Sequence, residues 1–269
     1  MAAPYKMNIL ITGASGFVGR NLCAQLRNIR DGKAKNYAVS GDLTLYEYDL
    51  NSTPEELDAY CRDADFVFNL AGVNRPQDPA EFMRGNFGFA STLLATLKKH
   101  GNTCPVMISS SIQAALDNPY GESKRAGEQL LFDYAEETGA KVLVYRFPNL
   151  FGKWCRPNYN SAVATFCNNI ANDLPITVND PSVVMHLVYI DDVVDELIGA
   201  LTGANTATGL SALFRHRTGL LWVRSSICCI RSGGCPRRWR SPIRPKTALR
   251  KNSTRRTSRT FRPTDSLTT

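Results

Sequence analysis

The amino-acid sequence predicts an α/β fold in which helices cover both faces of a doubly wound parallel sheet. From Met7 to about Leu201, short apolar runs alternate with amphipathic stretches, as strands and helices do in such a sheet. The first apolar run leads directly into a glycine-rich turn and a helical stretch. The length of 269 residues suits one large domain or two small ones, with ample core.

The expected elements follow one another regularly. Strands are expected where apolar, β-branched or aromatic residues form short runs, at 7–12, 43–48, 65–70, 106–108, 141–146 and 183–188. Helices are expected between these runs, at 20–29, 55–61, 80–100, 120–138, 161–171 and 191–201. The helix over 120–138 has an apolar stripe at Leu130, Leu131 and Tyr134.

The turn after the first strand has the spacing Gly-x-x-Gly-x-x-Gly, at Gly13, Gly16 and Gly19. The first glycine permits a tight turn, the second lets the backbone approach a pyrophosphate, and the third lets the helix pack close to the strand. The N-terminus of the following helix adds N–H donors and positive potential. Strand, turn and helix together therefore predict a Rossmann-type dinucleotide site.

Tyr120 and Lys124 are one helical turn apart, and they follow the serine run 109–111 by a short gap. Both side chains therefore leave the same face of a helix. A cation beside a phenol favours the phenolate, so we expect Lys124 to lower the pKa of Tyr120. A serine hydroxyl at the end of the preceding strand could hydrogen-bond the same substrate oxygen. The pattern is typical of proton transfer coupled to hydride transfer.

The net charge of +8 is concentrated in the C-terminal tail. Residues 1–203 hold 17 Lys and Arg against 23 Asp and Glu, whereas residues 204–269 hold 15 basic residues against the single acid Asp265. The tail is rich in Arg, Ser, Thr and Pro and lacks helical or strand periodicity. A disordered basic arm that binds nucleic acid is one explanation.

A frameshift is the explanation that we prefer for residues 204–269. Permitted codons for residues 251–263, re-read from each third base, encode Glu-Leu-Tyr-Ser-Thr-Tyr-Leu-Ser-Tyr-Leu-Pro. That phase has the aromatic and apolar content of a folded domain. We therefore expect a folded domain over 1–203 and a disordered, out-of-frame tail over 204–269, with no specific nucleic-acid partner.

The remaining composition is that of an ordinary globular protein, with 43% hydrophobic residues. No apolar run approaches the ~20 residues that a membrane span requires, and the N-terminus lacks a signal-peptide core. The eight cysteines form no C-x-x-C pair. We therefore expect reduced thiols, a cytoplasmic location and neither a metal site nor a membrane partner.

Six motifs occur in order between residues 7 and 202. They are Thr12–Gly19, Asn69–Gly72, Ser109–Ser111, Tyr120–Lys124, Arg146–Gly152 and Tyr189–Val193. Together they resemble the extended short-chain dehydrogenase/reductases of the NAD-dependent epimerase/dehydratase family, which act on nucleotide sugars. The resemblance implies a Rossmann-type fold and a homodimer formed through the helix Tyr120–Thr138.

Within that family the chain is most similar to the bifunctional reductases of capsular polysaccharide and O-antigen biosynthesis, which make a UDP-linked 2-acetamido-2,6-dideoxy-hexose. The similar segments are Leu70–Pro76, Ser109–Lys124 and Pro148–Asn160. Members of this subgroup continue into a cupin domain. The resemblance thus implies an incomplete C-terminal substrate-binding portion, with substrate-binding elements from about residue 149.

The resemblance also implies roles for individual residues. Tyr120 would be the acid, Lys124 would lower its pKa and hold the nicotinamide ribose, and Ser111 would polarise the substrate oxygen, with Ser110 as a rival. The residues expected to bind NAD or NADP are Gly13, Ser15, Gly16, Phe17, Val18, Gly19, Asp49, Leu70, Ala71, Gly72, Tyr120, Lys124 and Phe147. Those expected to bind the UDP-sugar are Asn74, Arg75, Asn149, Lys153 and Arg156. For Asn149 a simple turn role, and for Lys153 and Arg156 a solvated loop, are comparable alternatives.

The preference between NAD and NADP stays open. An acid at the end of the second strand accepts from a ribose 2′-hydroxyl and favours NAD, but Asp49 lies 30 residues past Gly19 where ~20 are expected. Arg20, Lys33 and Lys35 are the basic residues that could meet a 2′-phosphate.

Three functions compete. The first is NAD(P)H-dependent reduction of a UDP-linked 4-keto-6-deoxy-2-acetamido sugar, and the second is a nucleotide-sugar epimerase that holds NAD. The third is an inactive fragment that binds nucleotide. A dehydratase is disfavoured, because Ile112 and Gln113 stand after Ser111 where such enzymes have an acidic pair.

Overall fold

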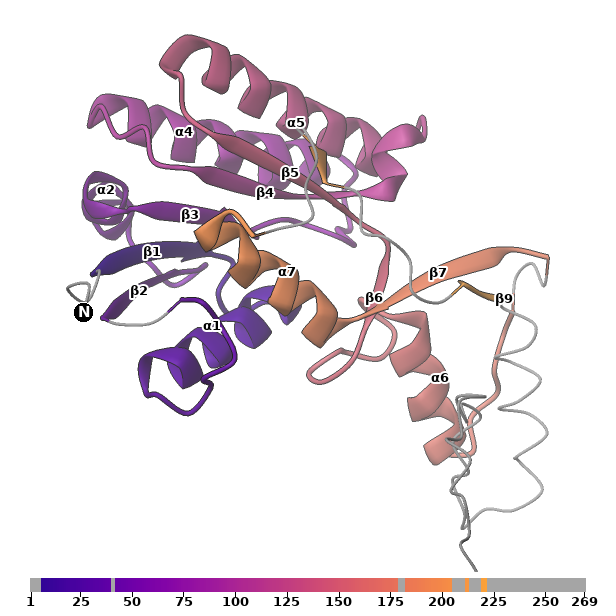
Figure 1. Ribbon diagram of the computed structural model, residues 1–269. Helices are drawn as coiled ribbons and strands as arrows, with labels where there is room; N and C mark the ends of the chain where they lie inside the picture. Colours follow the sequence, from indigo (N-terminus) through magenta and orange to yellow (C-terminus); the bar gives the residue numbers. More distant parts are fainter. Residues whose placement is uncertain (1–5, 40–41, 179–181, 205–210, 213–218, 222–269) are drawn as a thin grey trace, which may run out of the picture.

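The computed structural model describes residues 6–39, 42–178, 182–204, 211–212 and 219–221. Within these ranges the main sheet has six parallel strands (Figure 1). Across the sheet they run in the order β2 (Leu43–Tyr48), β1 (Met7–Thr12), β3 (Phe66–Asn69), β4 (Val106–Ser111), β5 (Val142–Phe147) and β8 (Ser211–Ala212). The predicted α/β doubly wound fold is confirmed.

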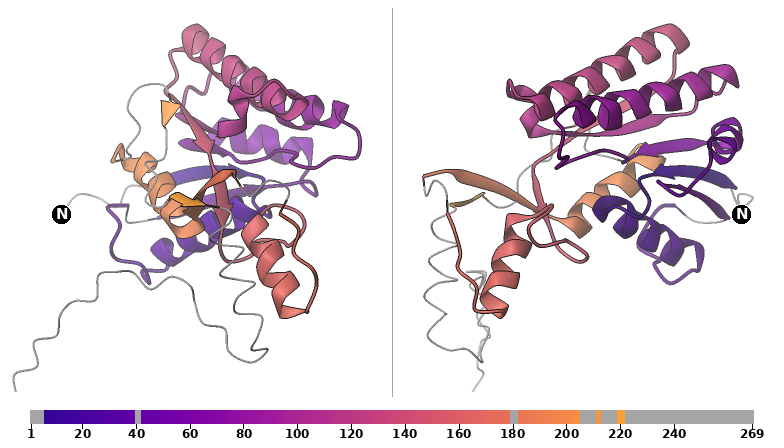
Figure 2. Two further views of the ribbon diagram at one scale, coloured as in Figure 1. Left: turned by 90° about the vertical axis from the view of Figure 1, so that its right-hand side faces the viewer. Right: turned by 180° about the vertical axis from the view of Figure 1, so that it is seen from behind.

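Two sets of helices cover the two faces of this sheet (Figures 1 and 2). One face is packed against α1 (Phe17–Arg30) and α7 (Ile190–Thr202). The other is packed against α2 (Pro54–Asp63), α4 (Phe89–Lys99) and α5 (Pro119–Thr138).

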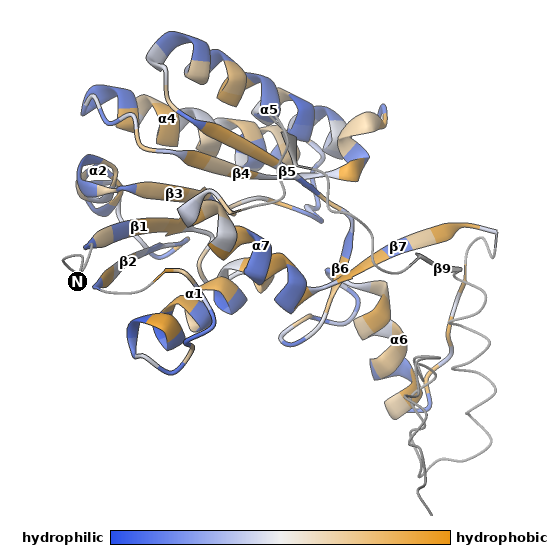
Figure 3. Ribbon diagram, in the orientation of Figure 1, coloured by the Kyte–Doolittle hydropathy of each residue, from blue (hydrophilic) through white to orange (hydrophobic). Residues whose placement is uncertain are grey.

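Alternate residues of each central strand enter the two cores. In β1, for example, Ile9 and Ile11 pack on the α1 and α7 side, while Leu10 packs on the opposite side. Figure 3 shows the resulting apolar colouring of the central strands between helices that are polar on their outer faces. Continuous apolar strands of this kind are typical of a parallel sheet buried on both faces.

The strand order reverses between β1 and β3. The chain winds from β1 outward to β2 on one side, and from β3 through β4 to β5 on the other. The loops at the carboxyl ends of β1 and β3 therefore lead to opposite faces of the sheet and leave a crevice between them. Ligands of open α/β sheets bind at this switch point.

A second, smaller sheet lies beyond the end of β5. Within the described residues it contains β6 (Asn149–Phe151), β7 (Val184–Tyr189) and β9 (Gly219–Leu221), with β6 and β7 parallel and β7 and β9 antiparallel. Together with α6 (Ala162–Ala171) it extends away from the main sheet (Figures 1 and 2). The sequence analysis did not predict β6, because three residues carry too little periodicity to be recognised.

Local signals set the ends of the key helix α5. The side chain of Asn118 accepts a hydrogen bond from the Gly121 N–H at the N-terminus, and Pro119 occupies the first turn. The helix ends at Gly139, which has a left-handed φ of 73°. These caps fix where Tyr120 and Lys124 begin to project.

The predicted single helix over 80–100 is interrupted. The structure has α3 (Ala80–Phe82), a π-helical segment η1 (Met83–Gly88) and then α4. π-Helical turns often lie at functional sites, since they re-aim a side chain. Here the turn contains Asn86, a buried polar residue.

The expected tail over 204–269 lies for the greater part outside the described residues, and so does the expected frameshift. The structure describes Ala204 and the short strands β8 and β9 of that segment. Among the helices in the described ranges, none combines the length and apolar content that crossing a bilayer requires.

Candidate active site

A cleft of about 600 Å³ lies at the carboxyl ends of β1, β2 and β3. Its walls come from the glycine-rich turn, the loops after β2 and β3, the start of α4 and the loop after β6. The lining residues are Gly13, Ser15, Gly16, Phe17, Arg20, Tyr48, Asp49, Leu50, Ser52, Leu70, Ala71, Gly72, Val73, Gly85, Phe89, Trp154, Arg156, Tyr159 and Asn160. Eight of the residues predicted to bind the cofactor are therefore in its wall. Val18 packs against the core instead, and Gly19 and Phe147 are buried.

The three glycines of the turn have different surroundings. A Cβ on Gly13, which has a φ of 67°, would lie 2.8 Å from the backbone nitrogen of Ala71. A Cβ on Gly19 would lie 2.2 Å from the carbonyl oxygen of Gly13, so α1 could not pack as it does. Gly16 is exposed, and its added Cβ would lie 3.0 Å from the Gly13 carbonyl oxygen, a tight contact with the backbone of the same turn. Gly16 thus leaves the backbone accessible on the cleft side.

Asp49 lies beside the glycine-rich turn despite its long sequence separation from Gly19. The backbone N–H of Ser15 donates to Asp49 Oδ2 at 2.5 Å, and the backbone N–H of Leu50 donates to Asp49 Oδ1 at 2.8 Å. The long connection 31–42 between α1 and β2 accounts for the extra residues. The Asp49 carboxylate therefore lies at the carboxyl end of β2, beside the glycine-rich turn. This is the place where an acid that binds the adenosine ribose is expected, although Asp49 is further from Gly19 in the sequence than usual.

Ser110 and Ser111 face different groups. The Ser110 hydroxyl donates a hydrogen bond to the buried carboxylate of Glu128 on α5. The Ser111 hydroxyl is at the carboxyl end of β4, where it accepts from the Gln113 N–H at 3.2 Å and also bonds the Tyr120 phenol. This geometry favours Ser111 over Ser110 as the hydroxyl that acts with Tyr120.

Tyr120 has a raised pKa, opposite to the direction that its pairing with Lys124 suggests. Burial removes water from the phenol and raises its pKa, and the hydrogen bond with Ser111 offsets part of the rise. Phe82 lies edge-on against the ring with centroids 5.4 Å apart, and the phenol donates to Asn74 Oδ1 at 3.4 Å. Desolvation therefore outweighs the Ser111 hydrogen bond and leaves the pKa of Tyr120 above its ordinary value.

Lys124 is buried between α5 and the ends of β3 and β4. Its Nζ donates to the Ser109 carbonyl at 3.2 Å and lies 5.7 Å from the centroid of the Tyr120 ring. A Cβ on Gly72 would lie 3.2 Å from this Nζ, so the ammonium adjoins the cleft wall. Burial lowers the pKa of Lys124 to about 8, and the negative charge of Glu128 opposes the fall.

Asn86 belongs to this group although the sequence analysis missed it. Its Oδ1 accepts from the Val73 N–H at 2.9 Å, and its Nδ2 donates to the Ser123 hydroxyl at 3.0 Å and to the Val73 carbonyl at 3.2 Å. It thereby ties the loop after β3 to α5. No sequence signal distinguished Asn86 from the other polar residues of 80–100, which include Glu81 and Arg84.

The loop 152–160 joins the glycine-rich turn to the second sheet. Arg156 lines the cleft, and Arg20 lies over the Trp154 ring at 4.7 Å from its centroid. Lys153 has a different environment, since its Nζ pairs with Asp191 at 2.7 Å and its carbonyl accepts from the Asn21 side chain.

The remaining predicted substrate residues lie near this loop. Arg75 donates to the Asn158 carbonyl at 3.1 Å, whereas Asn149 is exposed on β6. The structure therefore brings Arg75 and Arg156 together with this loop, and it engages the Lys153 ammonium in an ion pair.

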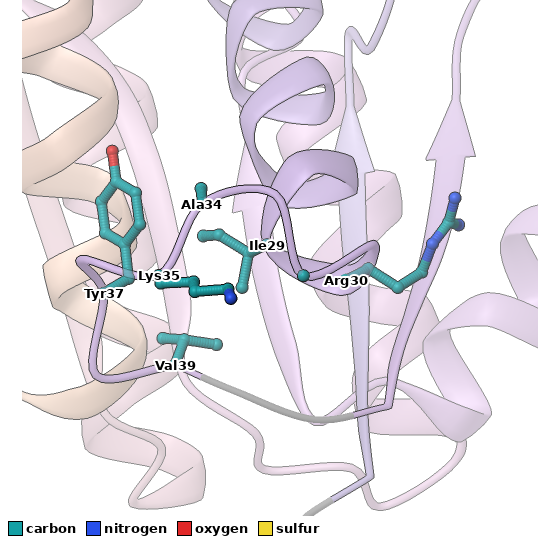
Figure 4. Close-up of a pocket in the computed structure, with 7 residues that line it drawn as sticks. Ile29, Arg30, Ala34, Lys35, Tyr37 and Val39 are labelled. Carbon is teal, nitrogen blue, oxygen red and sulfur yellow. The ribbon is translucent and has the colours of Figure 1, made fainter.

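A second cavity, of about 430 Å³, lies at the opposite end of α1. Figure 4 shows Ile29, Ala34, Lys35, Tyr37 and Val39 around it. Lys33 and Lys35 are in this region, beyond the C-terminus of α1, which is about 20 Å long. They are therefore too far from the glycine-rich turn to meet a 2′-phosphate there, and Arg20 is the basic candidate that lines the cleft.

The family model named NAD dependent epimerase/dehydratase family matches residues 9–209. The chain belongs to this family. The match confirms the family resemblance predicted from the motifs and extends past the expected boundary at residue 203. No group of three or more metal-ligating side chains is found in the part of this family member that the structure describes.

Two curated relatives represent different activities. A UDP-2-acetamido-2,6-beta-L-arabino-hexul-4-ose reductase of Pseudomonas aeruginosa is 46% identical over 197 residues, which are 73% of this chain and 50% of the relative. UDP-glucuronate 4-epimerase 1 of Arabidopsis thaliana is 27% identical over an alignment of 248 positions that covers 76% of this chain and 57% of the relative. The chain thus spans about half the length of the curated relatives it matches.

A solved structure also aligns with this family member. The capsular polysaccharide assembling protein CapF from Staphylococcus aureus has a TM-score of 0.70 and 43% sequence identity, covering 84% of this chain and 58% of that one. The doubly wound fold is therefore similar to that of a solved relative.

The buried charge of Lys124 should make the free energy of unfolding depend on pH. Its pKa is about 8 in the folded chain against 10.5 ordinarily, a difference worth about 3 kcal/mol. Between these values the unfolded chain binds more protons, so the cost of burial is full below pH 8 and is relieved as the pH rises to 10.5. We predict that Lys124→Met is more stable than the parent chain below pH 8, and that the gap closes above it.

Urea unfolding of the full chain across this pH range measures the gap. The control is Lys141→Met, because Lys141 is exposed just before β5 and its replacement removes a lysine that is not buried. A Lys124→Met gap that stays constant from pH 7 to 10.5 would contradict the buried-charge assignment.

Proposed function

We propose that this chain carries the reductase domain of a nucleotide-sugar enzyme. In this proposal it binds NADH or NADPH in the cleft at the ends of β1, β2 and β3 and reduces a UDP-linked 4-keto-6-deoxy-2-acetamido sugar. The observation that carries the reaction type is the group formed by Ser111, Tyr120 and Lys124, with the Lys124 ammonium against the cleft wall at Gly72. The substrate class rests on the 46% identity with the Pseudomonas aeruginosa reductase.

The cleft fits a dinucleotide by its backbone. Side chains are missing where a pyrophosphate would come closest, since Gly16 is exposed and a Cβ on Gly13 or Gly72 would collide with neighbouring atoms. The N-terminus of α1 points its free N–H groups at the same place, and it has no side-chain cap. When bound, NADH or NADPH would supply the hydride.

The chain's own residues would handle the proton. Tyr120 carries its proton at neutral pH, as a phenol ordinarily does, and burial raises its pKa further, so it could donate to the sugar oxygen. Ser111 bonds the phenol and would hold the same oxygen. Lys124 would hold the nicotinamide ribose with the ammonium that now bonds the Ser109 carbonyl. Asn74, which accepts from the phenol, would release it to the substrate.

The sugar nucleotide would lie along the loop 152–160. Arg156 lines the cleft and Arg75 contacts the same loop, and arginine suits a diphosphate. Lys153 is held by Asp191, so we assign it to loop anchoring and leave the diphosphate to the two arginines.

An epimerase is the second candidate, and the 27% identity with UDP-glucuronate 4-epimerase 1 favours it. Epimerisation at a carbinol begins with removal of a proton, for which Tyr120 would have to be ionised. The raised pKa of Tyr120 favours the proton-donating, reductive direction. Consumption of one NAD(P)H per sugar distinguishes reduction from epimerisation, and no turnover with intact cofactor binding would indicate an inactive nucleotide-binding fragment.

A homodimer formed through α5 and a cytoplasmic location stay predictions. The size of the full chain in solution, with and without substitutions on α5, tests the first. Fractionation of the source cells tests the second.

Gly16→Val should abolish NAD(P)H binding while the chain stays folded. The new side chain would stand on the exposed turn where the pyrophosphate must approach the backbone, and the Gly13 carbonyl oxygen, 3.0 Å from the added Cβ, would have to shift slightly. Fluorescence titration with NADH and NADPH measures binding, and circular dichroism confirms folding. Unchanged affinity in a folded Gly16→Val protein would refute this cofactor site.

Tyr120→Phe should lower reductase turnover about 10²–10⁴-fold, the range for loss of one proton-transfer group. Cofactor affinity should change little, because the phenol acts only on the reacting oxygen. The measurement is NADPH oxidation with a UDP-linked 4-keto-6-deoxy-2-acetamido sugar. The matched control is Tyr134→Phe on the same helix, whose hydroxyl contacts the Asn102 carbonyl away from the cleft. Equal turnover in Tyr120→Phe and the parent chain would remove Tyr120 from the mechanism.

Asp49→Asn should raise the affinity for NADPH relative to NADH by about tenfold. Asparagine keeps an oxygen that can accept from the Ser15 N–H, but it removes the negative charge that would face a 2′-phosphate. Arg20→Gln should move the ratio in the opposite direction, because it removes a cation from the same cleft. If the ratio of affinities is the same in all three proteins, neither residue faces the adenosine ribose.

A further inference from the structure

Glu128 is a buried carboxylate that lies outside the proposed proton-transfer group. It is on α5, and only 4% of its surface is exposed. Arg146 of β5 donates to both carboxylate oxygens, from Nε at 2.8 Å and from Nη2 at 2.5 Å, and the Ser110 hydroxyl donates a further hydrogen bond. A carboxylate removed from water needs such partners, so this one is held as a charge in a fixed place.

The position of Glu128 relates it to Lys124. The two residues are four apart on α5, and both are buried on the side of the helix that faces the sheet. Ser110 and Arg146 are register partners across β4 and β5, so Glu128 joins both strands to α5 at one point. That point is next to Ser111, one residue further along β4.

We propose that Glu128 and Arg146 are positioning residues for the proton-transfer group: Glu128 keeps the Lys124 side chain charged and aimed at the cleft, and Arg146 holds Glu128 in place and moderates its charge. This inference rests on the proposed function and deepens it. Neither residue would touch the substrate or the cofactor, and both would act through Lys124 and the end of β4.

The charged groups around Lys124 determine the direction in which each substitution should move its pKa. On α5 the titratable neighbours are Tyr120 and Glu128, and β5 contributes Arg146 through Glu128. The loop after β3 and the segment η1 bring uncharged groups, Gly72 and the side chain of Asn86. The Glu128 charge raises the pKa of Lys124 against the effect of burial. Its removal should therefore lower that pKa, and removal of Arg146 should raise it.

The experiment follows the Lys124 titration in the full chain. The Cε resonance of Lys124 is recorded against pH in lysine-labelled protein and assigned with a Lys124→Arg variant. We expect Glu128→Gln to lower the titration midpoint by about one pH unit and Arg146→Met to raise it by a similar amount. Glu128→Asp, which keeps the charge, should restore most of the midpoint. Glu136→Gln, an exposed position on the same helix, should leave it unchanged.

The opposite signs separate positioning by charge from simple structural support. Loosening of the fold would admit water and move Lys124 toward its ordinary pKa in both variants, so a shift in the same direction for both overturns the proposal. No shift in either variant overturns it as well. If Glu128→Gln does not fold, the proposal is judged on two other measurements. These are the rise in the Lys124 midpoint expected for Arg146→Met and the midpoint of Glu128→Asp.

Cofactor titration keeps this test distinct from that of the proposed function. The upper pH limit of NAD(P)H binding should move with the Lys124 midpoint in each variant. Absence of NAD(P)H binding in the parent chain would refute the proposed function, whereas the resonance titration would still judge the link between Glu128, Arg146 and Lys124.

Discussion

The backbone after β1 and the backbone after β3 approach so closely that only a glycine fits between them. At Gly13 an added Cβ would lie 2.8 Å from the Ala71 nitrogen, and the left-handed φ of 67° excludes most other residues. The buried Thr12 hydroxyl bridges the same gap, donating to Asn69 Oδ1 at 2.8 Å and accepting from the Ala71 N–H. This contact brings the N-terminus of α1 and the loop 70–73 to one place, so the cleft, Asp49 and the Lys124 ammonium all depend on it.

Around that contact the molecule buries polar groups that a stable core would avoid. Lys124, Glu128 and Asn86 are each less than one-tenth exposed, and each lies at the junction of α5 with a strand end or loop. Their hydrogen bonds limit the cost of burial without removing it, as the low pKa of Lys124 shows. A few kcal/mol is a large share of the stability of a domain of this size. Such groups fix distances between elements that apolar packing alone would leave adjustable.

The sequence predicted the local structure correctly where a particular residue type is needed for a particular backbone conformation or for burial. The glycine spacing predicted the turn and its helix, and the apolar runs predicted the central strands to within a few residues. Long-range geometry was not readable in the same way. The 30 residues between Gly19 and Asp49 argued against Asp49 as the ribose-binding acid, because the count includes the long connection 31–42. The pairing of Thr12 with Tyr48 places Asp49 beside the glycine-rich turn whatever the length of that connection. No sequence pattern singled out Glu128, because only the partner strand β5, with Arg146, explains its burial.

The direction of the pKa of Tyr120 was misjudged for an instructive reason. The motif places a cation one turn away, with its Nζ 5.7 Å from the Tyr120 ring centroid, but the loss of water that the same packing causes decides the pKa of the phenol. Here desolvation wins for both residues and favours their neutral forms, raising the pKa of Tyr120 and lowering that of Lys124. Paired groups whose surroundings push their pKa values in different directions are suited to distinct roles.

A proton donor benefits from such desolvation, since it keeps the proton until an alkoxide forms beside it. A ribose-binding ammonium does not, since its charge becomes costly as the site dries. The buried Glu128 carboxylate, one turn further along α5, offsets part of that cost for Lys124. In the proposed reaction, burial would keep the proton on Tyr120 while Glu128 opposes the loss of charge on Lys124.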